Sequence, residues 1–100
     1  MLHAQMCQGL ADPTRILILY LLADTPRYVS ELADTLDVKQ PTVSHHLKVL
    51  RERGLVTTTR EGNAIRYELR DHRIVDALDL LRAVMGDILS EQAKLISAVI

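Results

Sequence analysis

The sequence of 100 residues contains a single cysteine, Cys7, three tyrosines, and neither tryptophan nor phenylalanine. One cysteine excludes an intrachain disulfide and fits a reducing compartment, so we expect a cytoplasmic protein. Because aromatic residues are so few, the core must be aliphatic. The longest apolar run, residues 16–23, is too short to span a bilayer, and no signal peptide precedes it, so no membrane partner is expected.

The sequence also lacks the residue groups that catalysis requires. It has four glycines, and they form no phosphate-binding loop. Neither Cys7 nor the histidines stand in an arrangement of nucleophile, base and orienting group. His45 and His46 are adjacent and project in different directions from a helix, which disfavours a shared metal. We therefore expect that the protein is not an enzyme.

The length and composition predict one small folded domain over residues 1–100, with 48% hydrophobic and 25% charged residues. The formal net charge of −1 hides an uneven distribution. Residues 1–38 carry −3, residues 39–73 carry +4, and residues 74–100 carry −2. A middle third that concentrates the positive charge is expected of a surface that faces phosphates.

Residues 39–54, KQPTVSHHLKVLRERG, predict a short helix with two different faces. Val43, Leu47 and Leu50 share one apolar stripe, and Gly54 is a natural stop after the last turn. The opposite face carries small polar groups, a histidine and cations. That combination is typical of a recognition helix in a DNA major groove, while the alternative is an ordinary amphipathic helix with a solvated face.

A second short helix is predicted just before the first, over residues 28–36, YVSELADTL. Ser30 is its expected cap. The link of residues 37–39 is short, so residues 28–53 are predicted to form a helix-turn-helix.

The N-terminal part predicts two further helices. Residues 1–10 have the spacing of a short amphipathic helix. Asp12 is then the expected cap, and Pro13 the first residue, of a helix whose residues 16–23 are apolar nearly all round. We expect this second helix to be central and buried.

After the recognition helix the hydrophobic period changes to that of a β-strand, and residues 55–70 predict a hairpin that turns at residues 61–63. Ile65, Tyr67 and Leu69 alternate with charged residues, which indicates one buried and one polar face. A hairpin at this place with arginines on its polar face is typical of a DNA-binding wing. The alternative is a hairpin that only caps the core.

Residues 72–99 return to a helical period. The apolar stripe is wider than one small core requires: Ile74, Val75, Leu78, Leu80, Leu81, Val84, Met85, Ile88, Leu89, Leu95, Ile96, Val99 and Ile100. We expect one side of this helix to pack on its own domain and the other on a partner copy, together with residues 1–10. A two-fold homodimer would place two recognition helices about 34 Å apart on an inverted repeat.

The predicted fold class is therefore mainly α with a small β-hairpin, a winged helix-turn-helix that dimerises through its terminal helices. Three segments, LADPTRILILYLL, SELADTLDVKQPTVSHHLKVLRERGLV and REGNAIRYEL, resemble in order and spacing the ArsR/SmtB family of winged helix-turn-helix repressors. The resemblance covers about residues 9–70. It implies a dimeric repressor of double-stranded DNA that leaves its operator when an unidentified inducer binds. The alternative function is a protein-interaction module without sequence-specific DNA binding.

The resemblance also implies which residues contact DNA. Base edges would be read by Gln40, Thr42, Ser44 and His45. The remaining candidates, which would contact phosphates or lie near the wing tip, are Lys39, Lys48, Arg51, Arg60, Asn63 and Arg66. His46 flanks the apolar stripe, and we expect it to pack or to form hydrogen bonds rather than to read bases.

No intact metal site of the family is present, so the cofactor is unknown, and a protein without any cofactor is one of the interpretations. The cysteine pair that many members carry is missing from residues 27–32, and the positions of the terminal-helix metal site lack imidazoles, with Arg73 and Val84 in place. His72 with Asp76, or with Asp87 and Glu91, would bind a metal weakly at most, and a solvated helix face is favoured.

Cys7 and His3 are the candidate sensor residues, because a spacing of four places them on one helical face. Doubled across a dimer, they would supply four metal ligands. Cys7 would alternatively act as a redox or persulfide sensor with its partner copy. The remaining interpretation is that Cys7 is a small buried hydrophobic residue.

Overall fold

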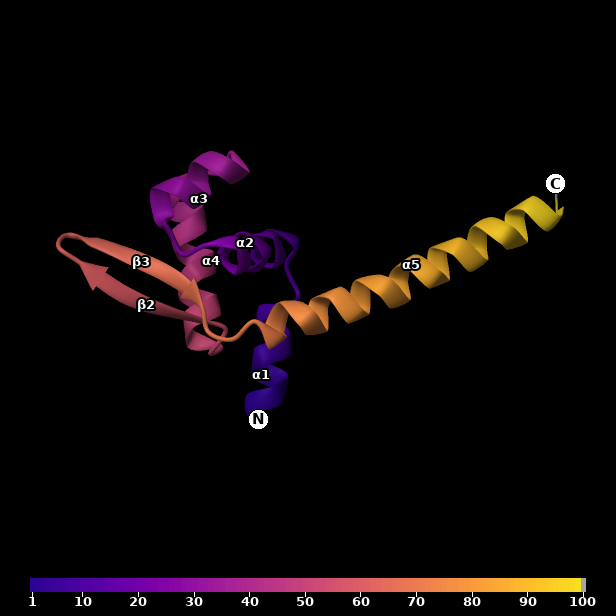
Figure 1. Cartoon of the computed structure of the whole chain (residues 1–100), viewed down its shortest axis with the longest axis horizontal. Helices are drawn as coiled ribbons and strands as arrows, with labels where there is room; N and C mark the ends of the chain where they lie inside the picture. Colours follow the sequence, from indigo (N-terminus) through magenta and orange to yellow (C-terminus); the bar gives the residue numbers. More distant parts are fainter. Residues whose placement is uncertain (100) are drawn as a thin grey trace.

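The structure, a computed structural model, describes residues 1–99. Within them the elements run in the order α1 (Leu2–Gly9), α2 (Pro13–Asp24), β1 (Arg27–Tyr28), α3 (Val29–Leu36), α4 (Gln40–Glu52), β2 (Val56–Glu61), β3 (Ala64–Leu69) and α5 (Arg73–Val99). Figure 1 shows a small body from which the hairpin β2–β3 extends on one side and α5 on the other. This arrangement confirms the predicted fold class, a mainly helical winged helix-turn-helix.

The core lies where α2, α3 and α4 meet the base of the sheet, and it is aliphatic as predicted. Its buried residues are Ile18, Leu19, Leu22, Leu32, Ala33, Val43, Leu47, Leu50, Leu55, Val56, Leu69, Val75 and Leu78. The prediction that α2 is central and buried is confirmed on one face, where Ile18, Leu19 and Leu22 pack in the core. It is wrong on the other face, because Leu17 is 53% exposed and Tyr20 is half-buried. A body of this size covers one face of α2 and leaves the other to solvent.

Local signals explain how α2 begins. The Oδ1 atom of Asp12 accepts a hydrogen bond from the backbone N–H of Arg15 at 3.0 Å, and Pro13 occupies the first turn. This confirms the predicted cap. The hydrogen bond from the Arg15 backbone N–H lowers the pKa of the Asp12 carboxyl, and the Arg15 guanidinium lowers it further, so the cap is anionic at neutral pH.

The helix-turn-helix consists of α3 and α4. The predicted cap of α3, Ser30, is wrong: Ser30 lies inside the first turn, and Tyr28 is the N-cap. The Tyr28 N–H donates to the Glu31 carboxylate at 3.0 Å, because β1 holds Tyr28 extended up to the first helical residue. Asp37, with a φ of 53°, turns the chain from α3 towards α4.

The recognition helix α4 matches its prediction. Val43, Leu47 and Leu50 are 0% exposed and anchor it to the core. Lys39 is the N-cap and provides no capping side chain, while Arg53 ends the helix. Gly54 follows with a φ of 78°, a left-handed conformation that glycine adopts without strain.

The sheet has one strand more than the predicted hairpin. Strands β2 and β3 pair from Val56↔Leu69 to Glu61↔Ala64, and β1 adds to the other edge of β3. A strand of two residues leaves no periodic pattern in a sequence, so it was not predictable. Only the base of the hairpin is buried, and its distal half projects into solvent, as expected of a wing.

Helix α5 leaves the body after its first turns. Val75 and Leu78 are buried, whereas most of the remaining apolar stripe is exposed: Leu80, Leu81, Val84, Met85, Ile88, Leu89, Leu95, Ile96 and Val99. The prediction that one side packs on its own domain is therefore wrong beyond these turns. Ile100 lies outside the described residues. None of the helices within residues 1–99 combines the length and apolar character that a membrane crossing requires.

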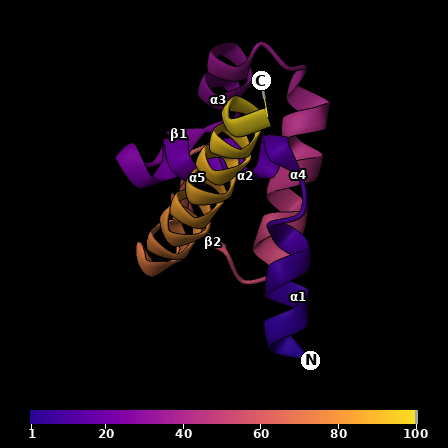
Figure 2. The same cartoon turned by 90° about the vertical axis from the view of Figure 1, so that its right-hand side faces the viewer.

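Helix α5 projects away from the body (Figures 1 and 2), and a polar clamp of Tyr20, Asp79 and Arg82 connects its first half to α2. The Tyr20 hydroxyl on α2 donates to Asp79 Oδ1 at 2.7 Å, and the Arg82 guanidinium lies 5.3 Å from the centre of the Tyr20 ring. The hydrogen bond to Asp79 raises the pKa of Tyr20. Because both partners of Tyr20 belong to α5, the clamp joins this helix to α2.

Candidate nucleic-acid interface

The outer face of α4 gathers the predicted base-reading residues. Gln40, Thr42, Ser44 and His45 are all exposed, within two turns from the start of the helix. Their short polar groups include the donors and acceptors that base edges require. Because the buried stripe on the other side fixes the helix, these groups are presented by a rigid element rather than by a loop.

Cations and the wing extend this face. Lys39 lies at the N-cap of α4, and the exposed Lys48 and Arg51 lie in its second half, with Lys48 Nζ 4.0 Å from Glu52 Oε1. Such an exposed ion pair is weak and leaves Lys48 available to a phosphate. Arg60 is exposed on β2, and its Nε donates to the Gly62 carbonyl at 3.4 Å.

A groove separates α4 from the wing. It has a volume of about 380 Å³, and Gln40 and Ser44 from α4 meet Asn63 and Ile65 of the wing there. Tyr28 also lines it. The structure thus brings three of the predicted contact residues, on two elements, around one hollow.

The predicted phosphate contact Arg66 is already paired. Its Nε lies 3.2 Å from Glu61 Oε1, and the hydroxyl of Tyr28 donates to the same carboxylate. This hydrogen bond raises the pKa of Tyr28. Sequence reasoning missed Tyr28 and Glu61. The available signal was an acidic residue at the turn of an otherwise arginine-rich hairpin.

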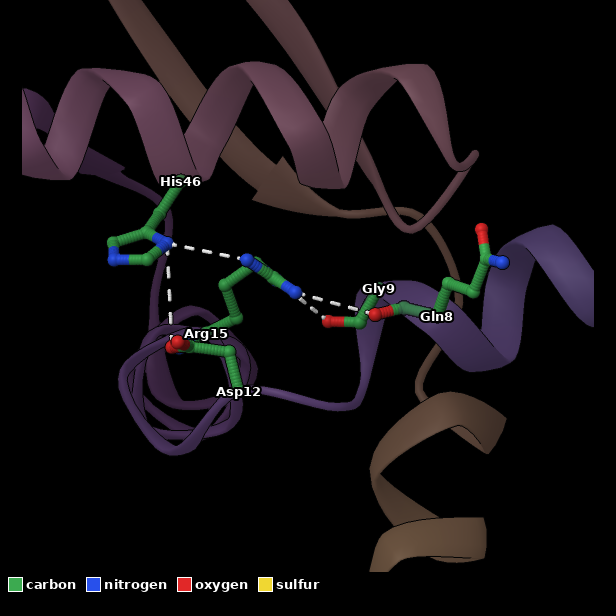
Figure 3. A network of polar contacts seen from close by, with 5 residues as sticks. All are labelled: Gln8, Gly9, Asp12, Arg15 and His46. Carbon is green, nitrogen blue, oxygen red and sulfur yellow. Dashed lines mark hydrogen bonds and ion pairs between the residues drawn. The ribbon is translucent and has the colours of Figure 1, made fainter.

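His46 lies behind the outer face, as predicted, with its side chain 14% exposed (Figure 3). Its Nδ1 is 3.5 Å from Arg15 Nη1 and 4.0 Å from Asp12 Oδ1. The same guanidinium donates to two carbonyls at the end of α1, Gln8 at 3.2 Å and Gly9 at 3.0 Å. Arg15 therefore joins α1, the start of α2 and the recognition helix, a role that the sequence did not indicate.

Gly9 permits the close approach on which this contact depends. A Cβ atom at Gly9 would lie 2.6 Å from Leu55 Cδ1 and 3.3 Å from Arg53 Cβ, so with a larger residue either the buried Leu55 side chain or the end of α1 would have to shift. The glycine thus serves packing between α1 and the body.

We predict that Arg15→Met lowers the free energy of unfolding by about 1–3 kcal/mol, because a part-buried carbonyl loses its donor. Urea denaturation at a fixed protein concentration measures this. The matched control is Arg60→Met, whose exposed side chain lies at the wing. Equal midpoints for the two variants would contradict the role of Arg15 as a junction.

The candidate sensor residues lie outside this interface. Cys7 and His3 are exposed on α1 and line a cavity of about 550 Å³ between α1 and α5, with apolar walls that include Met6, Ile74 and Leu81. The interpretation of Cys7 as a buried residue is therefore wrong for the single chain. A thiol in this position is accessible unless a partner molecule covers it.

Potential metal ligands do not converge within residues 1–99, where no three His, Cys, Asp or Glu side chains are placed to share an ion. Asp71 is bound by Arg73, whose Nη2 lies 2.7 Å from Asp71 Oδ2. The hydrogen bonds from Arg73 hold the pKa of Asp71 at about 2. This carboxylate is thus anionic at neutral pH and bound to Arg73.

Comparison with known proteins places these features in context. Residues 12–58 match the model of the family described as bacterial regulatory protein, arsR family. The chain is 44% identical over 70 residues to the HTH-type transcriptional repressor SmtB of Mycobacterium tuberculosis, covering 70% of this chain and 52% of that protein. It is 42% identical over 84 residues to the HTH-type transcriptional regulator CmtR of Mycobacterium bovis, covering 83% of this chain and 71% of that protein. The chain thus spans about half the length of the SmtB relative.

Solved structures agree on the fold. The crystal structure of M. tuberculosis Rv0081 superposes with a TM-score of 0.82 at 35% identity, covering 92% of this chain and 93% of that one. The homodimeric winged helix-turn-helix DNA-binding domain of Mb0332 from M. bovis gives a TM-score of 0.77 at 29% identity, covering 86% and 80%.

Proposed function

The chain belongs to the ArsR family of bacterial regulatory proteins, and from that premise we propose that it is a sequence-specific transcriptional repressor. It binds double-stranded DNA as a homodimer on an inverted-repeat operator, and an unidentified signal releases it. With chromosomal DNA as its partner, its place is the cytoplasm. The name of the SmtB relative, a transcriptional repressor, supports this function.

One observation carries the proposal: α4 combines a fully buried anchoring stripe with an exposed face of polar side chains whose chemistry suits base edges. Gln40 offers an amide, which pairs with two atoms of an adenine edge, and Thr42, Ser44 and His45 offer shorter contacts. Phosphates are bound by a surrounding set of polar and cationic residues: Lys39, Lys48, Arg51, Arg60, Asn63 and Arg66. Phosphate contacts fix the register in which the helix reads bases.

The exposed stripe of α5 supports the homodimer. An apolar surface of this extent on a single chain is unfavourable in water and is typical of an interface. The proposed dimer interface runs along the exposed stripe of α5, with α1 adjacent, so both terminal helices contribute. Two copies of α4 then face the same side of the assembly and reach successive turns of DNA.

Selection from a pool of random duplexes tests this function. We expect enrichment of an inverted repeat with half-sites one helical turn apart, about 10 base pairs from centre to centre. Enrichment of a single unpaired half-site would contradict the dimer. Recovery of no sequence above the starting pool would contradict the proposed function and favour the protein-interaction module.

A further inference from the structure

Glu61 holds together three elements that surround the groove beside α4. It is the last residue of β2, at the turn of the wing. Its carboxylate accepts a hydrogen bond from the Tyr28 hydroxyl at the start of α3 and lies 3.2 Å from the Nε atom of Arg66 on β3. The sheet supports this arrangement, because Tyr28 and Arg66 are direct partners across β1 and β3.

The cluster of Tyr28, Glu61 and Arg66 lies beside the DNA-facing groove. Tyr28 lines that groove opposite Gln40 and Ser44. The side chains of Glu61 and Arg66 are each 39% exposed, so part of each is accessible to an approaching phosphate, although the Nε atom of Arg66 that faces Glu61 is buried. A carboxylate at this position repels phosphate and competes with it for the guanidinium.

We propose that Tyr28 and Glu61 are positioning residues that hold the wing and withhold Arg66 from DNA until the recognition helix is seated. This inference rests on the proposed function. In a loose complex with a random sequence, Arg66 stays with Glu61, and the wing contributes little attraction. In the operator complex the wing is pressed against the backbone, and Arg66 exchanges the carboxylate for a phosphate. The cluster thus raises the ratio of specific to non-specific binding.

Glu61→Gln tests whether the negative charge of Glu61 withholds Arg66 from phosphate. Without the carboxylate, Arg66 acts as an additional phosphate contact on any sequence, so the slope of log K against log salt steepens by up to about 0.9 per protomer. For a dimer on random DNA, this amounts to about a tenfold larger loss of affinity between 50 and 200 mM salt than the wild type shows. A merely structural role would weaken binding without a steeper slope.

Glu68→Gln is the matched control, because Glu68 is an exposed residue of the same hairpin, on the same face of β3 as Arg66. Glu68→Gln also removes one negative charge from the hairpin but leaves Tyr28, Glu61 and Arg66 unchanged. A slope for Glu61→Gln equal to that of Glu68→Gln would overturn the proposal.

Tyr28→Phe tests the hold on the wing without any DNA. It removes only the hydroxyl that joins α3 to Glu61, so the amides of residues 60–64 are expected to lose order in ¹⁵N relaxation of the free protein. Tyr67→Phe is the control, since Tyr67 lines the same groove and, within residues 1–99, its hydroxyl has no protein partner. Unchanged wing order in Tyr28→Phe would overturn the proposal.

The salt dependence of DNA binding and the ¹⁵N relaxation of the free protein together separate this inference from the proposed function. If the wild type binds no duplex at any salt concentration, the proposed function fails, and with it the effect of the cluster on DNA. The relaxation data still decide whether Tyr28 and Glu61 hold the wing.

Discussion

The double variant Met85→Glu/Ile88→Glu is expected to be monomeric and to lose about 10²–10⁴-fold in operator affinity. Both side chains lie on the exposed stripe of α5, at 54% and 50% exposure. Four glutamates in a dimer interface would be buried without partners, which no small interface tolerates. In a dimer, once one protomer is bound, its partner binds the second half-site in an intramolecular step, which raises the affinity about 10²–10⁴-fold. A monomer loses this gain. Analytical ultracentrifugation and fluorescence anisotropy measure the two effects.

The control adds the same charges elsewhere on the helix. Ala83 and Ser90 are exposed and lie on the side of α5 opposite to the stripe, so Ala83→Glu/Ser90→Glu should stay dimeric. A dimeric Met85→Glu/Ile88→Glu variant, or one that is monomeric with unchanged operator affinity, would contradict the proposed assembly.

His45→Ala is expected to lower operator affinity at least about 30-fold while leaving affinity for random duplexes nearly unchanged. In each protomer the group on the base edge would be left without its partner, which costs about 1–3 kcal/mol, and the dimer loses this contact twice. Random-sequence binding depends on phosphates, which this change does not touch. Competition anisotropy with operator and scrambled duplexes measures the discrimination.

His72→Ala is the matched control, because His72 is exposed beside the first turn of α5 and outside the groove. It should leave both affinities as they are. If His45→Ala left the discrimination between operator and random DNA intact, the assignment of the reading face of α4 would be wrong.

Local signals in the sequence predicted much of this fold. Asp12 and Pro13 marked the start of α2, and Gly54 marked the end of α4. These two predictions were correct because a helix cap or a left-handed turn depends on only a few neighbouring residues. The stripe of Val43 and Leu47 likewise required only helical periodicity.

Contacts between distant parts of the chain were not predictable in the same way. Arg15 and His46 are 31 residues apart, and Tyr28 and Glu61 are 33 apart. No spacing rule connects such pairs, because their meeting depends on how the elements pack. The strand β1 exists only because β3 lies beside it.

For α5, periodicity identified the apolar face but not what covers it. A wide apolar stripe is compatible with burial against its own body or against another molecule. The contact of Tyr20 with Asp79, which joins α5 to α2, connects residues 59 positions apart, so no local signal predicted it. The prediction of a helix was therefore correct, and the prediction of its packing on the same chain was wrong beyond the first turns.

The most direct test of the central claim is fluorescence anisotropy with the reduced, chelator-treated protein. It is titrated onto a labelled duplex of the region upstream of its own gene, with a scrambled duplex of equal composition as control. We predict tight binding to the native duplex, weaker binding to the scrambled one, and a steep decrease of both with salt. Equal or negligible binding to the two duplexes would contradict a repressor that reads its operator through α4 without a ligand.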